Sequence, residues 1–97
     1  MSVFMIGYDL HEGEDYEDLI TAIKGLGSGW WHCLDSTWFI TSNSDASTIR
    51  DTLKPHLKRP DSNNGDRLLV VKVVTPTNWA CTGAFSDDCK NWLKNNL

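Results

Sequence analysis

The sequence predicts an α+β domain with the element order β-α-β-β-α-β and a small β-α appendix at its C-terminal end. Three observations lead to this prediction. Four separate runs of apolar, aromatic and β-branched residues are typical of strands. Two intervening segments carry apolar residues at helical spacing. The chain has 97 residues, enough for one domain over residues 1–97 with a single core.

The first strand and the first helix are predicted in residues 3–27. Residues 3–9 form an apolar run that ends at Asp9. A helix start is expected at residues 15–18, where acidic side chains would lie near the positive end of the helix dipole. The apolar residues that follow recur at helical spacing: Tyr16, Leu19, Ile20, Ile23 and Leu26. Gly27 is expected to close the helix.

A hairpin and a second helix are predicted next. Residues 29–34 and 37–41 are rich in aromatic and β-branched residues, and the short polar link between them is typical of a hairpin. Ser44 or Asp45 is expected to cap the second helix. Pro55 should end or kink this helix, because proline lacks the amide donor that a helix interior needs.

The last third of the chain predicts a fourth strand and the appendix. Residues 68–74 are apolar at nearly every position, which is typical of a central strand. Residues 79–82 are predicted as a short fifth strand, and Ser86 with the two aspartates after it is expected to cap a last helix. The order of the main elements is the split βαβ arrangement of ferredoxin-like domains, in which two helices cover one face of a four-stranded antiparallel sheet.

The predicted strands are apolar on both faces, which raises the question of what covers the second face. The first strand places Phe4 and Ile6 on one side and Val3 and Met5 on the other. Monomers rarely leave so large an apolar surface in water. We therefore expect a homodimer through the sheet face, with two sheets packed across a twofold axis. The alternative cover is the C-terminal segment with its two tryptophans.

Charge and cysteine usage limit the partners and the compartment. The formal net charge is −4 and the pI about 5.1, which disfavours strong sequence-independent binding to nucleic acid. Cys33, Cys81 and Cys89 show no paired spacing, so three free thiols and a cytoplasmic protein are expected. No apolar run reaches the roughly 18 residues of a membrane-spanning helix, so no membrane partner is predicted.

Asp9 is the first candidate for a functional residue. A carboxylate at the end of a buried strand is costly unless water, a metal or a hydrogen-bond partner meets it. The alternative is a strand-end residue bonded to the following loop. His32 is a candidate ligand or proton carrier, or else a ring packed between tryptophans. His11 with Glu12 or Glu14 is either part of a small metal site or an exposed loop residue.

The hairpin tryptophans have two interpretations. Trp30, Trp31 and Trp38 either stack on bases, as aromatic platforms do in single-strand binders, or pack in the core and in a dimer interface. Base-stacking platforms normally lie among Lys and Arg residues, and the hairpin has neither. The composition of the hairpin therefore favours packing.

Several motifs together carry a family resemblance. They are residues 8–10 at the end of the first strand, residues 31–38 in the hairpin and residues 66–71 at the fourth strand. On these residues the chain resembles the stand-alone SinR-like proteins of the CRISPR-associated Cas-two-like superfamily. The resemblance implies a ferredoxin-like homodimer in which Asp9 faces its twofold mate. It also implies a catalytic role for Asp9, which would hold Mg²⁺ or Mn²⁺ and so activate water for cleavage of RNA or DNA phosphodiesters.

The segment after Asp9 keeps a second hypothesis open. Where nuclease members of the superfamily carry a basic cluster, residues 11–15 are His-Glu-Gly-Glu-Asp, which would repel a phosphate. The second hypothesis is a non-catalytic protein-interaction or regulatory module of a prokaryotic or phage defence or toxin–antitoxin system.

Overall fold

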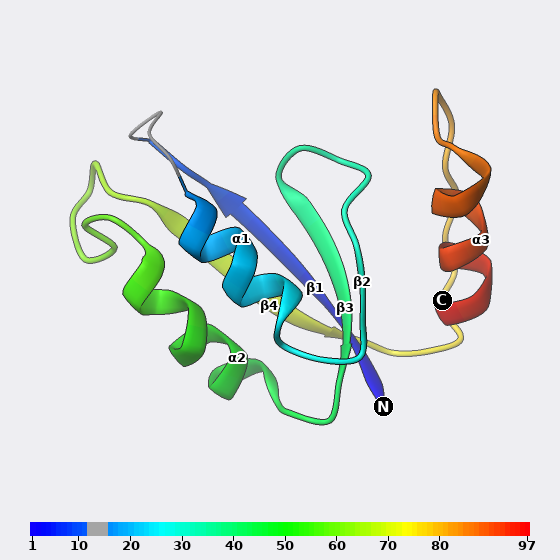
Figure 1. The fold of residues 1–97 in the computed structure, drawn as a ribbon, viewed down its shortest axis with the longest axis horizontal. Coiled ribbons are helices and arrows are strands. Elements are labelled where there is room, and N and C mark those ends of the chain that lie inside the picture. The colour runs from blue at the N-terminus through cyan, green and yellow to red at the C-terminus, as the bar shows by residue number, and fades with distance from the viewer. Residues whose placement is uncertain (12–15) are drawn as a thin grey trace.

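The computed structural model describes residues 1–11 and 16–97 and confirms the α+β class. Its elements in chain order are β1 (Ser2–Asp9), α1 (Glu17–Lys24), β2 (Gly29–Trp31), β3 (Thr37–Ser42), α2 (Ala46–Leu53), the 3-10 turn η1 (Lys54–His56), β4 (Arg67–Val73) and α3 (Asp87–Asn96). The strands form one antiparallel sheet in the order β2-β3-β1-β4 (Figure 1).

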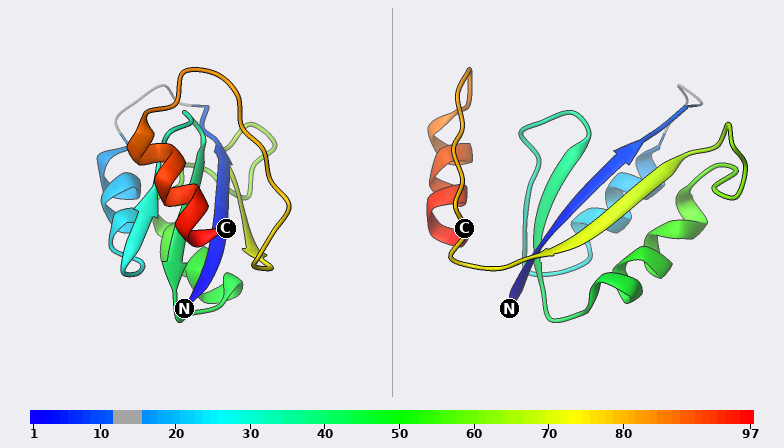
Figure 2. Two further views of the ribbon diagram at one scale, coloured as in Figure 1. Left: turned by 90° about the vertical axis from the view of Figure 1, so that its right-hand side faces the viewer. Right: turned by 180° about the vertical axis from the view of Figure 1, so that it is seen from behind.

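The sheet lies between two helical layers. Helices α1 and α2 cover one face, here called the helix face, and α3 lies on the opposite side, here called the second face (Figure 2, left). The main core forms on the helix face, from side chains that are all almost completely buried: Phe4, Ile6, Leu19, Ile23, Trp38, Ile40, Ile49 and Leu53. Because side chains alternate along a strand, the even-numbered residues of β1 supply the helix face and the odd-numbered ones the second face.

The helix ends follow the predicted capping chemistry closely. Asp45 rather than Ser44 caps α2, and its carboxylate accepts a 2.8 Å hydrogen bond from the Thr48 amide. This bond holds the pKa of Asp45 below its ordinary value. Ser86 caps α3 in the same way, at 3.1 Å from the Cys89 amide. Helix α1 ends with Gly25 at its C-cap, two residues before the predicted Gly27.

Gly27 nevertheless has a structural role in the link to β2. A Cβ at this position would overlap the Thr41 carbonyl of β3. The chain therefore passes too close to the sheet for any side chain there.

The prediction of a fifth strand at residues 79–82 is wrong. The chain from residue 74 to residue 86 contains no strand. It leaves β4 and runs back beside α3 (Figure 1), where the Thr77 amide donates to the Leu97 carbonyl at 2.8 Å. The appendix therefore consists of a loop and one helix, and its backbone pairs with that helix end rather than with a sheet edge.

The prediction that β4 is central is also wrong, because β4 is an edge strand next to β1. Its apolar pattern has a different physical origin. Leu68 and Val70 pack against the core on the helix face, whereas Leu69 is 60% exposed and Val71 is 40% exposed on the second face. A run that is apolar on both sides indicates a central strand only when both faces are covered.

The second face is covered over one half only. The rings of Phe39 in β3 and Trp92 in α3 stack with centroids 6.3 Å apart, and Leu93 is buried. The C-terminal segment therefore covers the β2–β3 half of this face. The sequence pattern had left this cover open as the alternative to a dimer. On the β1–β4 half, Val3 is buried and Met5 and Val73 are half-buried, whereas Leu69 and Val71 are exposed, so the open part is centred on β4. The homodimer stays a prediction.

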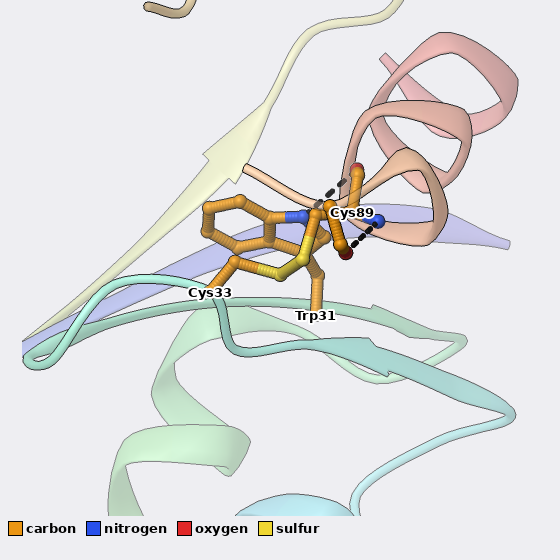
Figure 3. The surroundings of a disulfide bond; sticks show 4 residues. Trp31, Cys33 and Cys89 are labelled. Carbon is orange, nitrogen blue, oxygen red and sulfur yellow. Dashed lines mark hydrogen bonds between the residues drawn. A yellow bond between two sulfur atoms is a disulfide. The ribbon is translucent and has the colours of Figure 1, made fainter. Parts of the chain in front are cut away.

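A disulfide between Cys33 and Cys89 joins the segment after β2 to α3 (Figure 3). The prediction of three free thiols is therefore wrong, and Cys81 is a free, exposed cysteine. The two bonded cysteines are 56 residues apart, so their pairing depends on the fold and leaves no local pattern. Beside the disulfide, the indole N–H of Trp31 donates to the Cys89 carbonyl at 3.1 Å. The prediction of a cytoplasmic protein was based on three free thiols, so the disulfide removes that argument for it.

Within the described part of the chain, no helix is both long and apolar enough to cross a bilayer.

We predict that the denatured, unreduced protein contains one titratable thiol per chain, and three after reduction. Replacing both Cys33 and Cys89 by alanine should lower the free energy of unfolding by about 2 to 4 kcal/mol, because the cross-link restricts the unfolded chain. Thiol titration and urea unfolding measure the two quantities. The matched control, Cys81→Ala, should change the unfolding curve little, and three thiols without reductant would contradict the assigned bond.

Candidate functional site

Asp9 lies at the exposed end of β1. Its side chain is 65% exposed, and its Oδ2 atom lies 3.5 Å from Nε2 of His11 in the following loop. On the neighbouring strand its register partner is Arg67. The burial that would make this carboxylate costly is therefore absent, and a histidine of the adjacent loop is its partner.

A shallow hollow of about 250 Å³ lies beside Asp9 and is also lined by Gly7, Arg67 and Leu69. It combines one carboxylate with one guanidinium. Over residues 1–11 and 16–97, no three His, Cys, Asp or Glu side chains gather at metal-binding distance. Mg²⁺ and Mn²⁺ favour several oxygen ligands, so the described residues of a single chain do not fit such an ion. The predicted partners of His11, Glu12 and Glu14, lie outside the described residues.

His32 lies on the helix side of the sheet. Its ring stacks on the buried Trp38 ring, with centroids 3.7 Å apart and planes 10° apart. Its Nε2 atom lies 3.1 Å from the backbone carbonyl of Asp35. The hydroxyl of Tyr8 donates to the same carbonyl at 3.2 Å and accepts a 3.0 Å bond from the Trp38 indole N–H. This arrangement matches the alternative of a histidine packed against tryptophan.

The structure does not bring Asp9 and His32 together. Tyr8 and Trp38 lie on the helix face, so Asp9, the next residue of β1, projects from the second face. His32 stacks on Trp38 and thus belongs to the opposite side of the sheet. The catalytic roles predicted for both residues, and metal binding by Asp9, stay predictions.

Two of the three hairpin tryptophans pack within the chain. Trp31 and Trp38 are buried, and Trp30 is exposed with the Lys24 ammonium 4.7 Å from its ring centroid. A cation above the ring face stabilises this position without a nucleic-acid base.

The most constrained carboxylate belongs to Asp66, which is only 2% exposed. Its two oxygens accept the amide of His11 at 2.9 Å, the amide of Lys58 at 2.8 Å and the hydroxyl of Tyr16 at 2.9 and 3.0 Å. Burial raises the pKa of Asp66, but these hydrogen bonds and the nearby His11 charge outweigh it and hold the pKa below its ordinary value.

Asp66 binds the backbone of His11, two residues after Asp9. Its partners come from three segments: the chain just after β1, the residue before α1 and the loop after η1. The preceding Gly65 is buried, and a Cβ there would overlap the Arg59 carbonyl. Sequence reasoning missed this role of Asp66. The one available signal was a Gly-Asp pair before a strand, where aspartate commonly accepts backbone amides.

Comparison of the chain with protein-family models, with curated proteins and with solved structures finds no match.

We predict that Asp66→Asn lowers the free energy of unfolding at pH 7 by about 2 to 3 kcal/mol. An amide oxygen is a weaker acceptor than a charged carboxylate oxygen. In addition, the NH₂ group of asparagine would point at donors that one of the Asp66 oxygens now accepts. The pKa of Asp66 is lower in the folded state than in the unfolded state. The stability that its carboxylate contributes is therefore fully present above the unfolded-state pKa and is lost as the pH falls through the folded-state pKa. Urea unfolding between pH 7 and pH 2 measures both effects. Asp61→Asn, at a side chain 88% exposed, is the control. Equal losses in the two variants would contradict the role of Asp66.

Proposed function

We propose that this chain is a non-catalytic interaction module that acts as a homodimer through the open half of the second sheet face. The observation that carries the proposal is the apolar β1–β4 strip, defined as Met5, Leu69, Val71 and Val73. Leu69 and Val71 are the exposed centre of this strip, on an edge strand that pairs with β1 alone in the described part of the chain. Exposed apolar surface of this kind marks interaction sites.

A second copy of the chain is the partner that the strip fits. Twofold interfaces are self-complementary, so each residue meets the same patch on the other copy. The strip ends at Asp9 and Arg67, which carry opposite charges on neighbouring strands. A twofold axis that runs along the strands brings this end of both copies together, so the carboxylate of one copy can pair with the guanidinium of the other while the apolar centre is buried.

The fold and family assignments support the same proposal. We infer a ferredoxin-like arrangement from the sheet order β2-β3-β1-β4, with α1 and α2 on one face. The SinR-like resemblance, within the Cas-two-like superfamily, also implied a homodimer. On this basis the module would serve in a prokaryotic or phage defence or toxin–antitoxin system. Its location in the cytoplasm stays a prediction.

We predict that the protein sediments as a dimer at micromolar concentration and that Leu69→Lys shifts it toward the monomer. The introduced charge would have to be buried in the dimer, whereas in the monomer it lies in water and should change the free energy of unfolding by about 0.5 kcal/mol or less. Sedimentation and urea unfolding separate the two effects. Leu34→Lys, an exposed leucine near the opposite edge of the sheet, is the matched control. A monomeric wild type would refute the dimer.

A metal-dependent nuclease is the second candidate, and one observation favours it. Asp9 and Arg67 line one hollow, and Nε2 of His11 lies 3.5 Å from the Asp9 carboxylate, so a carboxylate, an imidazole and a phosphate-attracting cation lie near one another. A divalent ion would need more oxygen ligands than the described residues of one chain bring together. A dimer would add ligands if Asp9 of both subunits bound the same ion.

We predict that Asp9→Asn changes the free energy of unfolding by about 1 kcal/mol or less, since the side chain is mostly solvated. We also expect neither Mg²⁺ nor Mn²⁺ to raise the melting temperature and no cleavage of RNA or DNA to accompany either ion. Thermal melts and a nuclease assay test this, with Asp35→Asn as the control at another exposed aspartate. Metal-dependent cleavage that is lost in Asp9→Asn but kept in the control would replace the interaction module by the nuclease.

A further inference from the structure

A cavity of about 300 Å³ lies between the second sheet face and the C-terminal segment. Its walls come from distant parts of the chain: Trp31 and Phe39 from the sheet, Trp79 from the loop after β4, and Phe85 from the turn before α3. The rings of Trp31 and Phe85 stack with centroids 6.1 Å apart. The cavity lies over β2 and β3 and is separate from the β1–β4 strip.

The lining defines the chemistry of a ligand. None of the described residues that line the cavity has a charged side chain. The polar side-chain groups are the Thr37 and Thr82 hydroxyls, the Trp79 indole N–H, the Cys81 thiol and the Trp31 indole N–H, which is already bonded to the Cys89 carbonyl. A carboxylate, phosphate or ammonium would lose its hydration here without an ionic partner. Aromatic walls favour a flat ring through offset or edge-to-face contacts. A cavity of about 150 Å³ holds benzene, so this one has room for two fused rings.

The cavity is also pre-formed. The Cys33–Cys89 disulfide and the bond from the Trp31 indole to the Cys89 carbonyl fix α3 against the sheet (Figure 3). Helix α3 starts at a satisfied N-cap, and Leu93 is buried beneath it. A site held in place before the ligand arrives avoids the entropy cost of ordering its walls.

We propose that this cavity is a binding site for a small uncharged aromatic molecule of two fused rings. Pockets of this size, with a mostly apolar lining and few polar groups, are typical ligand sites, and four of the lining residues here are aromatic. Cys81 provides an internal reporter because it lines the cavity, is exposed, and is free while the other two cysteines are bonded to each other.

The test uses the full chain with its disulfide intact and 1-naphthol as the probe. Calorimetry measures binding, and the rate of Cys81 alkylation by iodoacetamide is followed with and without the probe. We expect 1-naphthol to bind and to slow alkylation at saturation. The anionic analogue 1-naphthoate should bind about tenfold more weakly, because its carboxylate has no partner in the lining. Equal affinities for the two compounds, or no binding of 1-naphthol, would overturn the proposal.

Two variants locate the site. Ala80→Trp and Thr82→Trp place a ring at residues that line the cavity, whereas Ala84→Trp adds the same ring in the same loop outside the lining. Binding should weaken about tenfold or more in both lining variants and stay unchanged in Ala84→Trp, with circular dichroism confirming that each variant folds. Retained affinity in both folded lining variants would place the binding elsewhere and overturn the proposal. The dimer test uses Leu69, so either proposal can fail alone.

Discussion

The buried carboxylate of Asp66 is the interaction on which the end of the sheet depends. Two backbone amides and one hydroxyl converge on it from the chain after β1, the start of α1 and the loop after η1. None of these donors takes part in the hydrogen bonds of a helix or of the sheet. Without the Asp66 carboxylate, each of them would need another acceptor. Since β4 begins at the next residue, the same carboxylate also fixes where Arg67 enters the sheet opposite Asp9. The placement of Asp9 and Arg67 at the surface therefore depends on Asp66, which is almost inaccessible to solvent.

The disulfide is the second constraint, because it decides which half of the second face stays open. Cys33 follows β2, so the bond to Cys89 holds α3 over the β2–β3 half. The helix covers Phe39 through Trp92 and leaves Leu69 and Val71 in contact with water. A tether near β4 would have exposed the aromatic half instead. The open strip and the aromatic cavity thus both follow from the position of α3, which this bond and the packing of Trp92 and Leu93 hold, and they lie on separate parts of the same face.

Sequence reasoning predicted the elements that depend on local physics. Helical periodicity, capping residues and turn chemistry are properties of neighbouring residues, and they correctly placed α2 with its Asp45 cap and α3 with its Ser86 cap. Apart from the end of α1, which was predicted two residues too late, the main failures required knowledge of distant neighbours. The apolar residues Leu69 and Val71 are compatible with a covered face and with an open one. The sequence separation of Cys33 and Cys89 does not show that the two residues are close in space. Asp66 was overlooked for the same reason, since its partners lie between 8 and 55 residues away.

Asp9 and Asp66 show why burial, rather than position at a strand end, decides what a carboxylate does. The sequence favoured Asp9 because it ends an apolar strand, yet its oxygens meet water and a loop histidine. Asp66 precedes an equally apolar strand, is itself buried, and accepts hydrogen bonds from two backbone amides. An exposed carboxylate retains its charge for an external group, and the nearest charged neighbour across the strands is Arg67. In the proposed dimer this arrangement would contribute orientation. Asp9 and Arg67 lie at the same end of the strip, so a twofold axis along the strands would place each carboxylate opposite the guanidinium of the other copy. The apolar residues would then supply the affinity, and Asp9 with Arg67 would select the geometry.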